Sequence, residues 1–152
     1  MKKLMLFVFI PLLSYSQNWE FIGFYPADGR HHPVTFSHDK FGLVIAGQNN
    51  AGEYLSDVLR YNSEENTWVE LSIFPGGPRG YAYGVADEFY AYIGFGSNYD
   101  GYPTDFWKYD MVNDSWEELA NFPNLGRDHP AMILSDNKIF VGMGSIDGEN
   151  LG

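Results

Sequence analysis

Three arginines recur in the same local setting, a loop rich in glycine or proline. Arg30, Arg79 and Arg127 lie at intervals of 49 and 48 residues. A guanidinium group in such a loop could hold a carboxylate or the hydroxyls of a sugar, because its N–H donors form a planar fork. We favour the alternative, a hydrogen bond to a neighbouring structural unit, because the same residue type occurs in every copy.

The position two residues after each arginine carries a ring that differs between the copies. It holds His32, Tyr81 and His129, and we predict that it contributes to a binding site because it varies where the scaffold repeats. Packing and turn hydrogen bonding are the alternatives. Two histidines also raise the question of a metal, but zinc and iron sites need three or four converging ligands, and no third is evident. We therefore predict no metal ligand.

A polar stretch at 97–104 supplies the remaining candidate binding residues. Asn98, Tyr99 and Asp100 combine an aromatic ring with polar groups, as sugar and peptide sites do. Neither this stretch nor 147–150 has the spaced carboxylates of a calcium loop. The sequence also lacks nucleophile elbows, phosphate-binding glycine loops and paired-histidine motifs. We accordingly predict no catalytic residue and no cofactor.

The elements that position these residues form a repeat, because five residue types share one period. Tryptophan and glycine recur three times with the spacing of the arginines, and aspartate and tyrosine twice. The residues are Trp19, Trp68 and Trp116; Gly47, Gly96 and Gly144; Asp57 and Asp105; and Tyr61 and Tyr109. We expect the tryptophans and tyrosines to be core residues and the aspartates to cap turn amides.

Each repeat predicts four short strands joined by turns. The first strand alternates apolar and polar residues, and the second is a continuous apolar run closed by glycine, which suits a strand buried on both faces. Four such strands at a period of about 50 residues indicate a blade of a β-propeller. The predicted strands are 34–37, 41–46, 57–61 and 67–71; 81–85, 90–96, 105–109 and 115–119; and 131–134 and 138–144.

The motif residues resemble those of the kelch repeat family. They are a Gly-Arg turn, a glycine-closed apolar strand, a strand with Asp four residues before Tyr, and a Trp seven residues after that Tyr. The resemblance implies an all-β, kelch-type β-propeller fragment. It would hold two full four-stranded antiparallel blades (about 34–71 and 81–119), a partial blade (about 131–152) and an N-terminal outer strand (19–24) of a closing blade. The glycine pairs usual in the family read Ala46-Gly47, Gly94-Phe95-Gly96 and Gly142-Met143-Gly144.

A closed propeller needs typically four to eight blades, so we expect this chain to be a truncated piece of a longer ring. The missing blades of the full-length propeller would then be its partner. Apolar blade faces and strand edges left exposed would favour self-association.

The N-terminus and the charge indicate the compartment and exclude some partners. Residues 1–16 have the order of a signal peptide: Lys2-Lys3, an apolar core, and a small-x-small site that predicts cleavage before Gln17. The domain would then span 17–152, without a transmembrane span, in a secreted, periplasmic or cell-surface protein. The net charge of −11 repels phosphate backbones, which argues against nucleic acid.

These observations favour a non-catalytic binding module that recognises a protein or glycan at one face of the ring. The resemblance also allows a carbohydrate-active enzyme of the kelch type, such as a sialic-acid mutarotase, which would use arginines and acidic residues around the channel. A third possibility is a truncated gene product without independent function.

Overall fold

The computed structural model describes residues 20–152, and this part of the chain is built from β-strands. It contains no helix that is long and apolar enough to cross a membrane. The expected signal peptide at 1–16 and the repeated Trp19 lie outside the described residues.

The first blade is an antiparallel sheet of four main strands with a short extension. β3 (Phe41–Asn49) pairs with β2 (Val34–His38) on one side and β4 (Tyr54–Asn62) on the other, and β5 (Thr67–Glu70) pairs with β4. The two-residue β1 (Arg30–His31) continues the sheet beside the end of β3. The register of β3 against β4 shifts between Ile45 and Gly47, and both strands continue past this bulge. The loop between the strands predicted at 41–46 and 57–61 is therefore shorter than expected.

The second blade repeats this arrangement with shorter strands. Its order is β6 (Tyr83–Ala86), β7 (Tyr90–Gly94), β8 (Phe106–Asp110) and β9 (Ser115–Leu119), all antiparallel. The first strand was expected to begin at Tyr81 but begins two residues later. The reason is the backbone of Tyr81, whose φ of 58° is incompatible with an extended strand.

The third unit is a partial blade. β10 (Ala131–Ser135) pairs with β11 (Lys138–Gly142), and β12 (Ser145–Ile146) forms a separate small hairpin with β13 (Glu149–Asn150). This hairpin, which the sequence did not predict, is the counterpart of the Asn98–Gly101 bridge in the second blade. The sheet of the first blade (four main strands and β1), the four-stranded sheet of the second and the two-stranded β10–β11 sheet thus confirm the predicted all-β architecture of repeated antiparallel blades.

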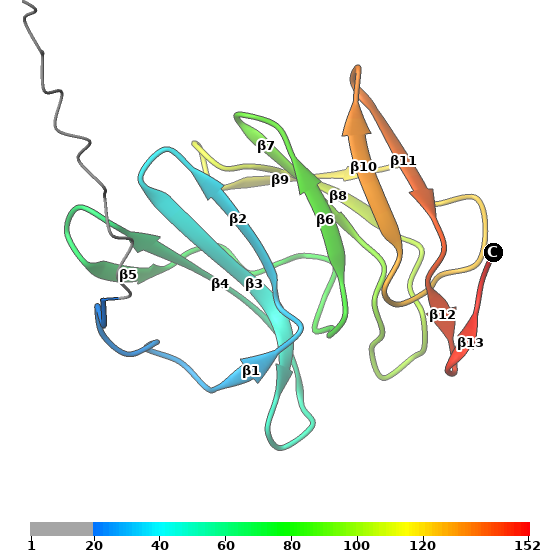
Figure 1. Ribbon diagram of the computed structural model, residues 1–152, viewed down its shortest axis with the longest axis horizontal. Helices are drawn as coiled ribbons and strands as arrows, with labels where there is room; N and C mark the ends of the chain where they lie inside the picture. The colour runs from blue at the N-terminus through cyan, green and yellow to red at the C-terminus, as the bar shows by residue number, and fades with distance from the viewer. Residues whose placement is uncertain (1–19) are drawn as a thin grey trace, which may run out of the picture.

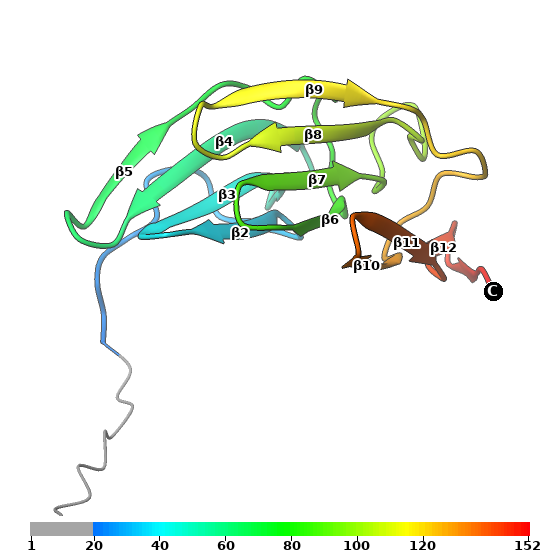
Figure 2. The same cartoon turned by 90° about the horizontal axis from the view of Figure 1, so that it is seen from above.

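The sheets stand side by side, with their first strands on a common inner side. Figure 2 shows β2, β6 and β10 along one side and β5 and β9 along the other, and β6 contacts both β2 and β10. The β3–β4, β7–β8 and β12–β13 connections lie along one edge, the lower edge in Figure 1. We call this edge, together with the starts of β2, β6 and β10, the loop face.

The main hydrophobic core lies between the first two blades. Leu43, Ile45 and Val58 of the first blade pack against Ala91 and Ile93 of the second, and each of these side chains is at most 2% exposed. Apolar residues at alternate strand positions produce this core, because successive side chains of a strand point to opposite faces.

The predicted N-terminal outer strand at 19–24 is wrong for the described part of that range, since residues 20–24 form no strand. A strand requires a neighbouring strand for its backbone hydrogen bonds, whereas the Ile22 carbonyl accepts its hydrogen bond from a side chain, Asn66 Nδ2, at 3.0 Å. Phe21 and Phe24 remain exposed.

Candidate binding site

The repeated arginines hold each blade together internally. Arg30 binds Asp57 through two parallel hydrogen bonds of 2.6 and 2.7 Å, and Arg79 binds Asp105 in the same way at 2.8 and 2.7 Å. Both arginine side chains are almost fully buried, at 4% and 1% exposure. Such fork-shaped pairs fix two segments of one blade, 26 or 27 residues apart, with respect to each other.

These pairs correct two expectations about the repeat. The aspartates bind arginine and, at Asp105, the Trp107 indole N–H at 2.6 Å, instead of capping turn amides. The arginine side chains bind their own blade, and the backbone makes the hydrogen bond between blades: the Arg79 carbonyl accepts from Gly47 N and the Arg127 carbonyl from Gly96 N, both at 2.9 Å.

The structure brings together the ring-bearing residues that follow the arginines. His32 stacks on Tyr81 with ring centroids 4.2 Å apart, and His129 lies 5.4 Å from His32 and 5.2 Å from Tyr81. Their neighbours His31 and Tyr83 extend the group, at 5.7 Å from Tyr81 and 6.1 Å from His129. We call these five residues the ring cluster. It spans three consecutive units on the inner side of the loop face, although its members are far apart in sequence.

A repeated backbone conformation orients the rings of His32, Tyr81 and His129. His32, Tyr81 and His129 have φ angles of 49°, 58° and 48°, in the left-handed region that non-glycine residues rarely adopt. The turn also brings the backbone close to the repeated glycine in or just after the second strand of the same blade. At Gly96 an added Cβ would collide with the backbone of Gly80 and Ala82, which explains the repeated glycine at that position.

Electrostatics favour the uncharged form of the His32 imidazole in the ring cluster. Burial lowers the pKa of His32 below its ordinary value of 6.5, and the nearby His31 and His129 lower it further, against an opposing effect of Asp128. The rings of His31 and His32 share a hydrogen bond of 2.8 Å between their Nδ1 atoms. A neutral imidazole offers one donor, one acceptor and a flat face to a ligand.

The loops beside the ring cluster are tied to one another by equivalent tyrosines. The Tyr54 hydroxyl meets Ser97 Oγ at 3.2 Å, and the Tyr99 hydroxyl accepts from Tyr54 N at 3.3 Å. One unit further on, the Tyr102 hydroxyl donates to the Asp147 carboxylate at 3.1 Å and accepts from Asp147 N at 2.8 Å. These contacts make a continuous surface of three separate loops.

This surface is acidic. No lysine of the described residues lies on these loops, since the lysines are in the β2–β3 turn, on β8 and at the start of β11. The loops carry several carboxylates. The carboxylates are those of Asp28, Glu53, Asp100, Asp128, Asp147 and Glu149. Within residues 20–152, no three histidine or carboxylate side chains are grouped so as to hold a metal ion.

The predicted site residues therefore separate into two groups. His32, Tyr81 and His129 belong to the ring cluster, and the exposed Tyr99 lies on the loops with Asn98 and Asp100, where the Asn98 side chain accepts from Asp100 N at 2.9 Å. Arg30 and Arg79 are occupied inside the blades, whereas the Arg127 side chain donates its hydrogen bonds to the Leu125 and Met143 carbonyls.

Sequence reasoning missed His31, Tyr83 and Tyr54. The interval of 48 residues between Tyr54 and Tyr102, which lies in the predicted polar stretch at 97–104, could have identified Tyr54.

Comparison with known families agrees with the repeat. Residues 43–75 match the family model described as Kelch motif. The matched range begins inside β3, includes β4 and β5, and ends at residue 75, before the second blade. No curated protein matches the chain.

Proposed function

We propose that this kelch-repeat chain is a secreted, non-catalytic binding module that recognises a protein ligand at the loop face. A kelch repeat generally mediates protein binding. The observation that carries the proposal is the ring cluster, in which side chains from three units converge beside an acidic surface. The preferred ligand would be an extended protein segment that carries basic and aromatic side chains.

The chemistry of the surface supports that choice. The faces of the tyrosine rings attract flat or cationic groups, since the face of an aromatic ring is electron-rich. The surrounding carboxylates steer cationic segments toward the face and repel acidic ones, an effect that is screened by salt. The tyrosine-linked loops limit the entropy lost when the ligand binds.

A glycan is the second candidate for the same face. Sugar rings stack on aromatic side chains, and the Tyr99 ring is 72% exposed beside Asn98 and Asp100. Sugar hydroxyls could reach the polar groups of this loop. A neutral sugar would, however, gain nothing from the acidic surroundings, so its binding would depend little on salt.

The mutarotase alternative loses its support at Arg30 and Arg79. Its chemistry requires guanidinium groups that face the channel, whereas these two are buried in ion pairs with Asp57 and Asp105. We therefore do not propose an enzymatic activity.

The experiment compares matched ligands and matched variants. Calorimetry would measure binding of a peptide rich in lysine, arginine and tyrosine, the same peptide with glutamate in place of the basic residues, and a panel of neutral oligosaccharides. We expect the basic peptide alone to bind, and more weakly at higher salt. Tyr81→Asn, which keeps a residue type that tolerates the left-handed backbone, should weaken binding about tenfold or more.

His38→Asn is the matched control, because His38 lies in the β2–β3 turn at the opposite edge and contacts Glu88 and Phe89. Equal loss in both variants, or a preference for the acidic peptide, would contradict the proposed site. Binding of oligosaccharides alone would favour the glycan.

For secretion, we propose that the chain expressed in a bacterium from its Met1 is exported and that its mature N-terminus is Gln17, as N-terminal sequencing would show.

A further inference from the structure

Three of the five residues of the ring cluster are histidines, and they come from two units that are not adjacent. His31 and His32 belong to the first unit and His129 to the third. The ring centroids of His31 and His32 lie 5.0 Å apart, and those of His32 and His129 lie 5.4 Å apart. Histidine is the side chain that ordinarily gains its charge between about pH 8 and pH 5. A modest fall in pH therefore brings positive charges together in a small space.

A hydrogen bond within the cluster requires that at least one of two histidines is uncharged. The bond of 2.8 Å between the Nδ1 atoms of His31 and His32 needs one donor and one acceptor. An imidazolium ring has two donor nitrogens and no acceptor, so this bond is lost once both rings are charged. His129 meets His32 at an interplanar angle of 90°, and like charges at this separation repel each other.

Tyr81 can stabilise one of these charges. Its ring stacks on His32 at an interplanar angle of 30°, and the face of an aromatic ring attracts a cation. His31 and His129 instead meet the Tyr81 ring at 60° and 61°, with centroids 5.7 and 5.2 Å away. In acid we therefore expect His32 to stay on Tyr81, and His31 and His129 to move away from it.

One carboxylate opposes the three imidazoles. Asp128 Oδ1 lies 3.4 Å from His129 Nδ1 and also accepts a hydrogen bond of 2.5 Å from Ser145 Oγ. Burial, His31 and His129 lower the pKa of His32 from 6.5, and the effect of Asp128 in the opposite direction does not cancel them. The closed arrangement of the rings is thus most stable above pH 6.5 and loses stability as the pH falls below that value.

The other groups around the cluster keep a constant charge over this range of pH. Tyr81 and Tyr83 are uncharged phenols. Arg30 is a permanent cation that pairs with Asp57, and Arg127 is one that binds backbone carbonyls. β2, β3, β6 and β10 carry no acidic or basic side chain apart from His38, at the far end of β2. A change between neutral and mildly acidic pH therefore acts on this site through its histidines.

We propose that the ring cluster is a pH-sensitive switch, closed at neutral pH and open near about pH 5, and that its opening releases a cationic ligand. The inference rests on the proposed function, because it concerns the ligand expected at the loop face. In the closed form the rings stay together and the acidic surroundings attract the ligand. In the open form the imidazolium groups repel one another and the ligand.

Coulomb's law gives the size of the effect. A positive charge about 5 Å from a ligand cation, in water at about 0.1 M salt, weakens binding about two- to threefold. Three such charges together raise the dissociation constant of a basic peptide about tenfold or more between about pH 7.5 and pH 5. The peptide with glutamate in place of the basic residues should bind more tightly at the lower pH, because the added charges attract it.

Calorimetry at the two pH values would measure this effect. The basic peptide, acetylated and amidated at its ends, has no group of its own that titrates in this range. A triple variant, His31→Asn with His32→Asn and His129→Asn, should lose most of the pH dependence. Asparagine tolerates the left-handed backbone at the last two positions. His38→Asn, at the opposite edge, should preserve the pH dependence.

NMR of the chain without ligand tests the opening separately. Nuclear Overhauser effects between the His32 and His129 rings should be present at about pH 7.5 and lost at about pH 5. The triple variant is not needed for this measurement, so its folding does not affect the result.

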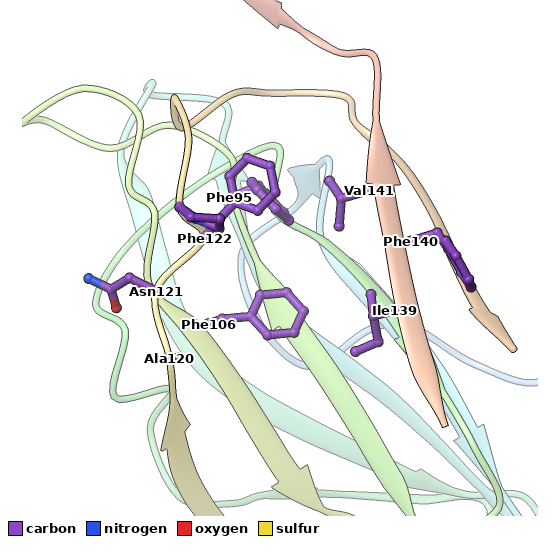
Figure 3. Close-up of a pocket in the computed structure, with 9 residues that line it drawn as sticks. Phe95, Phe106, Ala120, Asn121, Phe122, Ile139, Phe140 and Val141 are labelled. Carbon is purple, nitrogen blue, oxygen red and sulfur yellow. The ribbon is translucent and has the colours of Figure 1, made fainter. Parts of the chain in front are cut away.

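An apolar groove beside β11 provides the internal reference. It has a volume of about 440 Å³, and its lining residues are apolar or, at Asn121, uncharged. Figure 3 shows Ile139 and Val141 pointing from β11 toward Phe106 and Phe95. The methyl signals of Ile139 should therefore stay unchanged while the ring cluster opens, whereas acid unfolding of the whole chain would change both.

The outcomes separate the switch from the proposed function. A basic peptide that binds equally well at both pH values overturns the release and leaves the binding site standing. A peptide that binds at neither value refutes the proposed function and with it the release, whereas loss of the ring contacts would still establish the opening. Ring contacts that persist in acid, or a pH dependence that survives in the triple variant, overturn the switch.

Discussion

Removal of the Asp105 carboxylate tests the inference that buried arginine–aspartate pairs hold each blade together. Asp105→Ala deletes two hydrogen bonds to Arg79, of 2.8 and 2.7 Å, and one from the Trp107 indole N–H of 2.6 Å. The guanidinium of Arg79 stays behind with 1% of its side chain exposed. Loss of one partner of a buried pair costs about 3–5 kcal/mol, because the remaining charge is left uncompensated.

An exposed ion pair of similar length provides the matched control. Lys40 and Glu64 are also 2.6 Å apart, but their side chains are 34% and 67% exposed. Glu64→Ala should therefore cost about 1 kcal/mol or less, since water screens the pair. Each substitution removes the carboxylate of an ion pair of similar length, and the pairs differ in burial and in the two further hydrogen bonds that Asp105 accepts.

Urea unfolding followed by circular dichroism and tryptophan fluorescence would give the free energy of unfolding of each variant. The total stability of a domain is about 5–15 kcal/mol, so the loss expected for Asp105→Ala is a large share of it. This loss should lower Tm by roughly 6–20 °C. Similar losses in the two variants would show that burial of Arg79 does not set the strength of the pair, and the reasoning would be refuted.

Three further predictions concern the backbone, acid stability and the ring cluster. Gly96→Ala should lower the free energy of unfolding by about 2 kcal/mol or more, because the φ of Gly96 is 83° and an added Cβ would collide with Gly80 and Ala82. Gly52→Ala is the control, since Gly52 has a similar φ of 82° but open space around it, and should cost about 1 kcal/mol. Urea unfolding would measure both. Burial would raise the pKa of Asp114, but hydrogen bonds from Ser72 and Tyr109 hold it below its ordinary value of 3.8. The stability that Asp114 contributes is thus complete above pH 3.8 and is lost as the pH falls below that value. Asp114→Asn should therefore make the free energy of unfolding less dependent on pH between about 5 and 2, the range of carboxyl titration. An unchanged pH dependence would contradict this. The His32 ring should titrate below 6.5 by NMR, and His129→Asn should raise its midpoint by removing a neighbouring positive charge; a midpoint above 6.5 in the unaltered chain would speak against the described cluster.

The repeat made most of the strands predictable. Alternation of apolar and polar residues and glycine-closed runs located the strands of both blades, because these patterns reflect burial on one face or on both. The errors occurred where the backbone departs from the extended form. Tyr81, at φ 58°, delays β6, and the register shift after Ile45 allows β3 and β4 to run further than expected.

The candidate site was predictable as a set of positions but not as an arrangement. Comparison of the copies singled out His32, Tyr81 and His129, since they vary where the scaffold repeats, and the structure places their rings next to one another. It could not identify the partners of the arginines, because Asp57 and Asp105 are distant in sequence and an aspartate at a strand start fits a turn cap equally well.

The sequence by itself determined the period, the all-β architecture and the positions that carry rings. Those properties are local, since they depend on residue type and spacing. Only the tertiary structure decided that Arg30 and Arg79 form ion pairs within their own blades, and that three rings about 50 residues apart in sequence meet at one face. The groove beside β11 emerges in the same way. The physical reason is that these contacts depend on how whole sheets pack side by side and on the sign of a few φ angles, which spacing along the chain does not specify.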